Sequence, residues 1–264
     1  MTANQKGEKT LKETIIRELK KIEKTENIKI IHAIESGSRA WGFPSPDSDY
    51  DVRFIYIRPK EFYLKLEKTR DVIEWQLDET LDINGWDIKK ALTLIHSSNA
   101  SLYEWINSPV VYSSTAETEL LRPVMEEYFS VKSVASHYQA MAKKNYIENF
   151  TGETVRLKKY FYVLRPLMAC MYTLEKKKFP PVAFSELLKI LDYKKVLDEI
   201  DRLLEIKKDT DEKGEIVRSE ILDNFIELNL IMLEDKIINL PKEDKPSWDS
   251  LDKLFLRLSG SIDN

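Results

Sequence analysis

The chain has 264 residues, of which 42% are hydrophobic, 33% charged and 10% aromatic, which suits one large or two small globular domains and excludes a disordered chain. No stretch approaches the ~18 consecutive apolar residues of a membrane span, and the N-terminus lacks the apolar core of a signal peptide. The single cysteine, Cys170, excludes an internal disulfide. We therefore expect a cytoplasmic protein with no membrane partner. The formal net charge of −4 argues against extensive binding to duplex nucleic acid, because phosphate contacts need many Lys and Arg side chains.

The first predicted elements are a helix, two strands and the turn between the strands. Residues 8–26 carry apolar side chains at helical spacing and predict an amphipathic helix. Residues 28–35 (IKIIHAIE) predict a buried strand. Residues 36–50 (SGSRAWGFPSPDSDY) are rich in the turn formers Gly, Ser, Pro and Asp. The alternating, β-branched and aromatic residues 51–59 (DVRFIYIRP) predict a second strand.

Two more strands and a helix complete the first half. A short helix is expected near residues 59–67, followed by strands at 71–76 and 79–86. Asp87 is suited to cap the helix that follows, because the run DIKKALTLIHS has apolar residues at helical spacing.

Strand patterns end near residue 115, and helical patterns fill the rest of the chain. The predicted helices are 117–129, 132–149, 153–175, 185–207, 214–237 and 247–259. We therefore predict an α+β protein with a mixed-sheet α/β domain at 1–115 and an all-helical domain at 116–264.

The strongest chemical signal is the pair Asp49 and Asp51, at the start of the second strand. Side chains two residues apart in a strand project from the same face, and two neighbouring carboxylates repel each other unless a cation lies between them. Mg²⁺ prefers such oxygen ligands. An Asp-x-Asp pair alone is common turn chemistry. Here a buried strand leads into Gly37 and Ser38, and ten residues separate Ser38 from Asp49.

This arrangement resembles the DNA polymerase β-like nucleotidyltransferase superfamily, whose motif is Gly-Ser, a short spacer and Asp-x-Asp. The runs ESGSRAWGFPSPDSDYDVRFIYIRP, INGWDIKKAL, NASLYEWINSPVVY and LKKYFYVLRPLMA look like the predicted nucleotidyltransferases associated with RNA-repair gene clusters. The likeness covers most of residues 27–175. It implies nucleotidyl transfer by the α/β domain, with an NTP as substrate and one or two Mg²⁺ ions.

Members of the superfamily usually place a third carboxylate on a later strand, between two apolar residues. The Leu-Asp-Ile run at 81–83 fits this pattern and favours Asp82. Asp87 is the competitor, although it also suits a helix cap, and Glu74 is a further candidate. The residues assigned to metal binding and catalysis are Asp49, Asp51 and Asp82.

Several side chains are candidates for nucleotide binding. The turn at Gly37 and Ser38 can present backbone N–H groups and a hydroxyl to a phosphate. Arg39 follows directly and is either a phosphate ligand or a surface arginine. Arg53, two residues after Asp51 on the same strand, is expected to pair with a site carboxylate or to touch phosphate.

A second set lies in residues 132–178, which hold ten basic and three acidic side chains. Here Lys158, Lys159, Tyr162 and Arg165 recur at helical spacing and predict a cationic face opposite an apolar one. We predict that Lys159 and Arg165 bind the triphosphate. A grip on a nucleic-acid backbone and a plain solvated helix face are the alternatives.

The leading hypothesis is a Mg²⁺-dependent enzyme that moves an NMP from an NTP to an acceptor hydroxyl and releases pyrophosphate. The resemblance favours an RNA or tRNA end as the acceptor. A small molecule or a protein side chain is the alternative acceptor, and a non-catalytic nucleotide-binding or antitoxin-like partner protein is the alternative class. The sequence does not fix the base, the acceptor or the oligomeric state.

Overall fold

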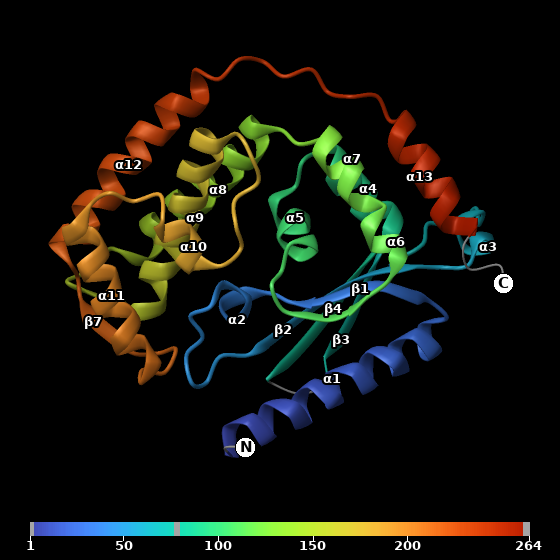
Figure 1. The fold of residues 1–264 in the computed structure, drawn as a ribbon, viewed down its shortest axis with the longest axis horizontal. Coiled ribbons are helices and arrows are strands. Elements are labelled where there is room, and N and C mark those ends of the chain that lie inside the picture. Colours follow the sequence, from blue (N-terminus) through green and yellow to red (C-terminus); the bar gives the residue numbers. More distant parts are fainter. Residues whose placement is uncertain (1–2, 77–79, 261–264) are drawn as a thin grey trace.

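The computed structural model describes residues 3–76 and 80–260 (Figure 1). Its strands in the first half are β1 (Lys29–Glu35), β2 (Tyr50–Ile57), β3 (Val72–Gln76), β4 (Leu81–Asp87) and β5 (Val111–Ser114). They form one five-stranded sheet in the order β3-β4-β2-β1-β5. β2 and β4 are parallel, whereas the other neighbours are antiparallel. The sheet is therefore mixed, as predicted.

Helices cover both faces of this sheet. The helices of the first half and of the segment after β5 are α1 (Ala3–Glu26), α2 (Gly37–Trp41), α3 (Lys60–Tyr63), α4 (Ile88–His96), α5 (Ala100–Ile106), α6 (Ala116–Glu119) and α7 (Leu121–Glu127). Alternate residues of β2 serve the two faces. Val52 and Phe54 belong to the core that includes α1, whereas Ile55 and Ile57 belong to the core that includes α4 and α5. Burial on both faces explains why β1 and the second half of β2 are almost continuously apolar.

The second half is helical. Its helices are α8 (Val131–Asn149), α9 (Leu157–Lys176), α10 (Phe184–Leu188), α11 (Lys194–Lys208), α12 (Glu220–Ile238) and α13 (Asp249–Ser259). The fold-class prediction is thus confirmed: a sheet domain precedes a helical region. The structure adds a two-stranded ribbon of β6 (Thr154–Arg156) and β7 (Glu215–Val217). None of the described helices is both long and apolar enough to cross a lipid bilayer.

The two halves are not packed independently. α13 returns to the sheet half (Figure 1), where Leu251, Leu254 and Leu258 join the core with α4. Phe43, in the loop after α2, packs instead against Phe161 of α9 at a ring-centroid distance of 5.0 Å. Residues beyond 115 therefore complete the first core, and the boundary at 115/116 stays a prediction.

Several element boundaries differ from the predicted ones. The helix predicted at 185–207 is two helices, α10 and α11, and the helix predicted at 153–175 begins only after β6. The strand β5 was not predicted, because it has four residues, lies at the sheet edge and is largely exposed. The strand predicted at 79–86 begins at Leu81 in the structure, and residue 79 lies outside the described residues.

Candidate functional site

The Gly-Ser turn contacts the strand that carries the first aspartates. Gly37, which opens α2, has a φ of +64°. A Cβ atom at this position would lie 2.2 Å from Asp51 Oδ2. The amide of Ser36 donates to the Asp51 carbonyl at 2.8 Å. Glycine is needed here both for the backbone conformation and for the close approach of the turn to the carboxylate.

Asp51 and Asp82 pair in register across the parallel strands β2 and β4. Leu81 and Ile83, on either side of Asp82, are buried, whereas Asp82 is exposed. Asp82 therefore points away from the core, as the Leu-Asp-Ile pattern predicts for a residue between two buried ones in a strand. The structure brings Asp82 next to Asp51 at the beginning of both strands.

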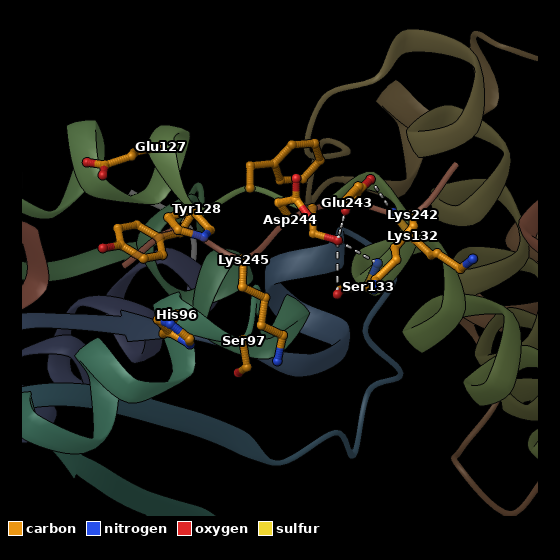
Figure 2. A pocket seen from close by; sticks show the side chains of 13 residues that line it. His96, Ser97, Glu127, Tyr128, Lys132, Ser133, Lys242, Glu243, Asp244 and Lys245 are labelled. Carbon is orange, nitrogen blue, oxygen red and sulfur yellow. Dashed lines mark hydrogen bonds between the residues drawn. The ribbon is translucent and has the colours of Figure 1, made fainter. Parts of the chain in front are cut away.

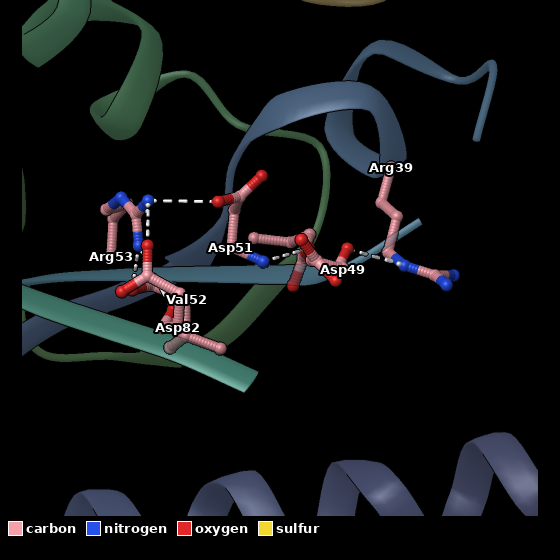
Figure 3. Close-up of polar contacts among 7 residues, drawn as sticks. Arg39, Asp49, Asp51, Val52, Arg53 and Asp82 are labelled. Atoms are coloured by element: carbon pink, nitrogen blue, oxygen red, sulfur yellow. Dashed lines mark hydrogen bonds and ion pairs between the residues drawn. The ribbon is translucent and has the colours of Figure 1, made fainter. Parts of the chain in front are cut away.

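Arg53 binds both carboxylates through a single nitrogen atom (Figure 3). Its Nη2 donates to Asp51 Oδ1 at 2.9 Å and to Asp82 Oδ2 at 2.7 Å. Burial raises the pKa of Asp51, while Arg53 lowers it and the nearby charges of Asp82 and Asp49 raise it further. Since one cationic atom reaches both carboxylates, their oxygens surround a common cation position. Two carboxylates so placed fit a hard divalent cation.

Asp49 precedes β2, and the hydrogen bonds of Arg53 to Asp51 and Asp82 do not include it. Its backbone carbonyl accepts a hydrogen bond from Arg39 Nε at 3.1 Å (Figure 3). Within residues 3–76 and 80–260, no three Asp, Glu, His or Cys side chains converge closely enough to hold a metal ion. The structure therefore joins two of the three predicted acids, and the role of Asp49 as a metal ligand stays a prediction.

The competing acids lie elsewhere. Asp87 caps α4, since its Oδ1 accepts from the Lys89 amide at 2.8 Å, and its Oδ2 accepts from the Tyr63 hydroxyl at 3.1 Å. Burial raises the pKa of Asp87 to about 6. Glu74 is exposed and pairs with Arg70 at 2.6 Å. Both side chains thus have local partners away from Asp51.

Glu35 is a buried acid that the sequence analysis did not single out. Its Oε1 accepts from the Asp51 amide at 2.9 Å, and its Oε2 accepts from the Tyr112 hydroxyl at 2.5 Å. Burial raises the pKa of Glu35. The sequence could have indicated Glu35, because it is an acidic residue at the end of an apolar strand, just before the Gly-Ser turn. Glu35 fixes the backbone from which Asp51 projects.

Arg39 organises the loop between α2 and β2. Its Nη2 donates to the Ser48 carbonyl at 2.7 Å, and its guanidinium carbon lies 3.6 Å from the ring centroid of Tyr50. These contacts order the backbone around Asp49. Nucleotide binding by Arg39, Gly37 or Ser38 stays a prediction.

The N-terminal part of α9 carries two adjacent lysines with different surroundings. Lys158 Nζ binds Glu212 Oε2 at 2.7 Å, and Lys159 Nζ lies 5.5 Å from the ring centroid of Tyr162. Burial lowers the pKa of Lys159, and neighbouring cations lower it further. Burial raises the pKa of Tyr162 to about 12, with added contributions from Glu212 and Asp51. Tyr162 of α9 therefore lies within electrostatic reach of Asp51.

Arg165 departs from the expected cationic face. It is only 1% exposed, and its Nη1 donates to Glu104 Oε1 at 2.8 Å while its Nη2 donates to the Val182 carbonyl at 3.2 Å. Its guanidinium carbon also lies 4.5 Å from the ring centroid of Trp41. The helix turns Arg165 into the core, so the exposed cationic face ends before it. Trp41 anchors α2 on the helical half, since its ring centroid also lies 5.8 Å from that of Tyr162.

Several pockets open on the surface of the described part of the chain. A pocket of about 940 Å³ is lined by the loop after α2 and by α11, with Arg39, Tyr50 and Lys207 among its walls. A second pocket of about 290 Å³ is lined by α4, α7, α8 and residues 242–246 (Figure 2). Glu243 lies over the start of α8 there and accepts from the Lys132 amide at 3.2 Å. Of these two pockets, the first adjoins the Gly-Ser turn and the second does not.

Comparison with known proteins gives matches along most of the chain. Residues 11–257 match the RlaP family, described as the RNA repair pathway DNA polymerase beta family. The uncharacterized protein YcgL of Bacillus subtilis (strain 168) is 42% identical over 248 residues, which is 93% of this chain and 95% of that protein. The crystal structure of a nucleotidyltransferase-like protein from Exiguobacterium sibiricum 255-15 is 14% identical, with a TM-score of 0.30 over 95% of this chain and 81% of that one.

Proposed function

This chain belongs to the RNA repair pathway DNA polymerase beta family, and from this premise we propose that it is a metal-dependent nucleotidyltransferase. The proposed reaction transfers an NMP from an NTP to an acceptor hydroxyl and releases pyrophosphate. The observation that carries the proposal is the in-register pair of Asp51 and Asp82, directly beside the turn at Gly37.

Asp51 and Asp82 would hold a divalent cation, with Asp49 as a third ligand. Mg²⁺ suits these carboxylate oxygens. Such an ion, when bound, supplies positive charge that stabilises the triphosphate and the transition state. Arg53 would then release at least one of the two carboxylates that it binds here.

The side chains around the acids would position the reactants. Ser38, Arg39 and Lys159 would bind the triphosphate. The acceptor oxygen forms a bond to the α-phosphorus as the bond from that phosphorus to the pyrophosphate oxygen breaks. Asp82, whose side chain is 55% exposed against 34% for Asp51, would accept the proton of the acceptor hydroxyl. Positioning and electrostatic stabilisation are sufficient, so no covalent enzyme intermediate is needed.

An RNA or tRNA end is the proposed acceptor. The description of the family supports an RNA substrate. The net charge of −4 favours a short end over a long duplex, because duplex binding needs many phosphate contacts. The basic side chains of the segment 132–178, apart from the buried Arg165, would offer the cations for such a short contact.

The test is to incubate the protein with each α-labelled NTP, Mg²⁺ and a pool of cellular RNA. We expect label in the RNA fraction, and loss of that label in Asp51→Asn. Label in a protein or small-molecule fraction would replace the proposed acceptor. Failure to label any acceptor with any of the four NTPs would contradict the proposed activity.

A further inference from the structure

Glu212 reaches from the turn between α11 and β7 into the loop beside the Gly-Ser turn. Its Oε1 accepts a hydrogen bond from Ser48 Oγ at 3.1 Å, and its Oε2 accepts one from Lys158 Nζ at 2.7 Å. Its backbone N–H donates to Asp47 Oδ1 at 2.9 Å. These three contacts attach a turn of the helical half to the loop that leads to the aspartates.

Ser48 connects Glu212 to Ser38, the serine that we assign to the phosphates. Ser38 Oγ donates to Ser48 Oγ at 3.3 Å, and both serines are buried. The donors therefore run in a chain from Ser38 through Ser48 to the Glu212 carboxylate. That carboxylate accepts from a hydroxyl on one oxygen and from an ammonium group on the other.

These contacts are the ones that a phosphate group would make. Phosphate oxygens form strong, charge-assisted hydrogen bonds with ammonium groups and accept from hydroxyls. Glu212 also adds negative charge to an acidic site, since it raises the pKa of Asp51 and of Tyr162. Among these groups, Lys158 is the cation that offsets the charge of Glu212 in this structure.

We propose that Glu212 occupies the position of a triphosphate oxygen in this structure and competes with the nucleotide for Lys158. This inference rests on the proposed function, because it takes the Gly-Ser turn as the phosphate site. When the nucleotide binds, Lys158 exchanges the carboxylate for a phosphate oxygen, and the 209–214 turn moves away from Asp47 and Ser48.

The ends of this turn are held by other contacts, so its tip can move alone. The carbonyl of Gly214 accepts from the Leu157 amide at 2.9 Å. At the other end, the buried Lys207 donates from Nζ to Ser45 Oγ at 2.6 Å. Movement of the tip therefore breaks the contacts of Glu212, while the hydrogen bonds of Gly214 and Lys207 at the two ends of the turn remain.

The test is calorimetric titration with inorganic tripolyphosphate and Mg²⁺, which requires neither the correct base nor an acceptor. Glu212→Gln keeps the size and one hydrogen bond of the side chain but loses its charge. We expect it to bind tripolyphosphate more tightly than wild type, on the order of ten-fold. Lys158→Ala should bind more weakly. The matched control is Glu215→Gln in the same segment, whose carboxylate contacts Thr154 at 3.0 Å, and it should bind like wild type.

Hydrogen exchange gives a second readout of the same movement. Tripolyphosphate should speed exchange of the Glu212 amide, which donates to Asp47 here, and leave the Leu157 amide unchanged. Equal or weaker binding by Glu212→Gln, or slower exchange at Glu212 in the complex, would overturn the proposal. Transfer activity that depends on Asp51 would leave the proposed function standing in that case, so the two ideas fail separately.

Discussion

Asp51 lies opposite Asp82 in the parallel ladder of β2 and β4. Tyr56 and Asp87 form another pair of the same ladder, five residues further along each strand. At ~3.3 Å per residue, Asp87 is therefore roughly 16 Å from the position of Asp82. The register of the two strands therefore places Asp82, and not Asp87, beside Asp51.

Arg53 is expected to oppose metal binding, because its guanidinium occupies the cation position shared by Asp51 and Asp82. Arg53→Met should bind Mn²⁺ several-fold more tightly than wild type. Without metal, its melting temperature should fall only slightly, since ion pairs with exposed members contribute about 1 kcal/mol or less. Titration of Mn²⁺ and melting in EDTA measure the two effects. Arg70→Met, which removes an exposed pair with Glu74, is the control. Weaker Mn²⁺ binding by Arg53→Met would show that Arg53 supports the site.

Gly37→Ala and Gly42→Ala separate backbone strain from displacement of the carboxylate. Both glycines have positive φ, +64° and +90°, so both substitutions should cost about 1 kcal/mol or more of stability. A Cβ at Gly37 would meet Asp51 Oδ2 at 2.2 Å, whereas a Cβ at Gly42 meets nothing within 4 Å. We expect only Gly37→Ala to weaken Mn²⁺ binding, measured on folded protein. An equal loss in both variants would contradict the contact between the turn and Asp51.

Asp87 should make stability depend on pH. Burial raises its pKa from the ordinary 3.8 to about 6. The folded protein therefore binds this proton more tightly than the unfolded chain, so the contribution is complete below about pH 4 and is lost as the pH rises through 6. Relative to Asp87→Asn, wild type should lose on the order of 2 kcal/mol between pH 4 and pH 7. Urea denaturation of both proteins at these pH values measures it. A difference that does not change with pH would refute this account.

Arg165 is expected to act through stability. Arg165→Met leaves Glu104 partly buried without its cation, which should cost about 3 kcal/mol in the free energy of unfolding. Adding Glu104→Gln to Arg165→Met should restore part of that loss, because the unpaired charge is removed. Chemical denaturation of the single and double variants tests this. If Arg165→Met has normal stability but no longer binds tripolyphosphate, this account is wrong and Arg165 is a phosphate ligand.

The acid site could be predicted from the sequence because its parts are short patterns. Each of these patterns, Gly-Ser, Asp-x-Asp and Leu-Asp-Ile, indicates a local backbone conformation or the face of a strand to which a side chain points. Together with the family resemblance, they predicted that Asp82 accompanies Asp49 and Asp51. The register of β2 and β4 places Asp82 beside Asp51, and the catalytic role of the three acids stays a prediction. The local pattern did not show that Arg53 would bind both carboxylates together, since that depends on a strand pairing 29 residues apart in the chain.

Contacts between distant segments could not be predicted in the same way. Glu212 reaches Ser48 across 164 residues, and no spacing in the chain signals it. Arg165 has helical spacing from two lysines, yet its partner Glu104 is 61 residues away and draws it inward. The three-residue strands of the β6–β7 ribbon are likewise too short to show an alternating pattern, and only their pairing defines them.

The measurement that tests the central claim most directly is the transfer of an α-labelled nucleotide to RNA by Asp51→Asn and Asp82→Asn. The matched control is Asp71→Asn, because Asp71 is an exposed acid that pairs with Lys90. We expect Asp51→Asn and Asp82→Asn to lose at least ~100-fold in rate with melting temperatures near that of wild type, since their carboxylates would stabilise the transition state through the metal. The control should keep full activity. Full activity in either site variant would contradict the assignment of this pair as the catalytic centre.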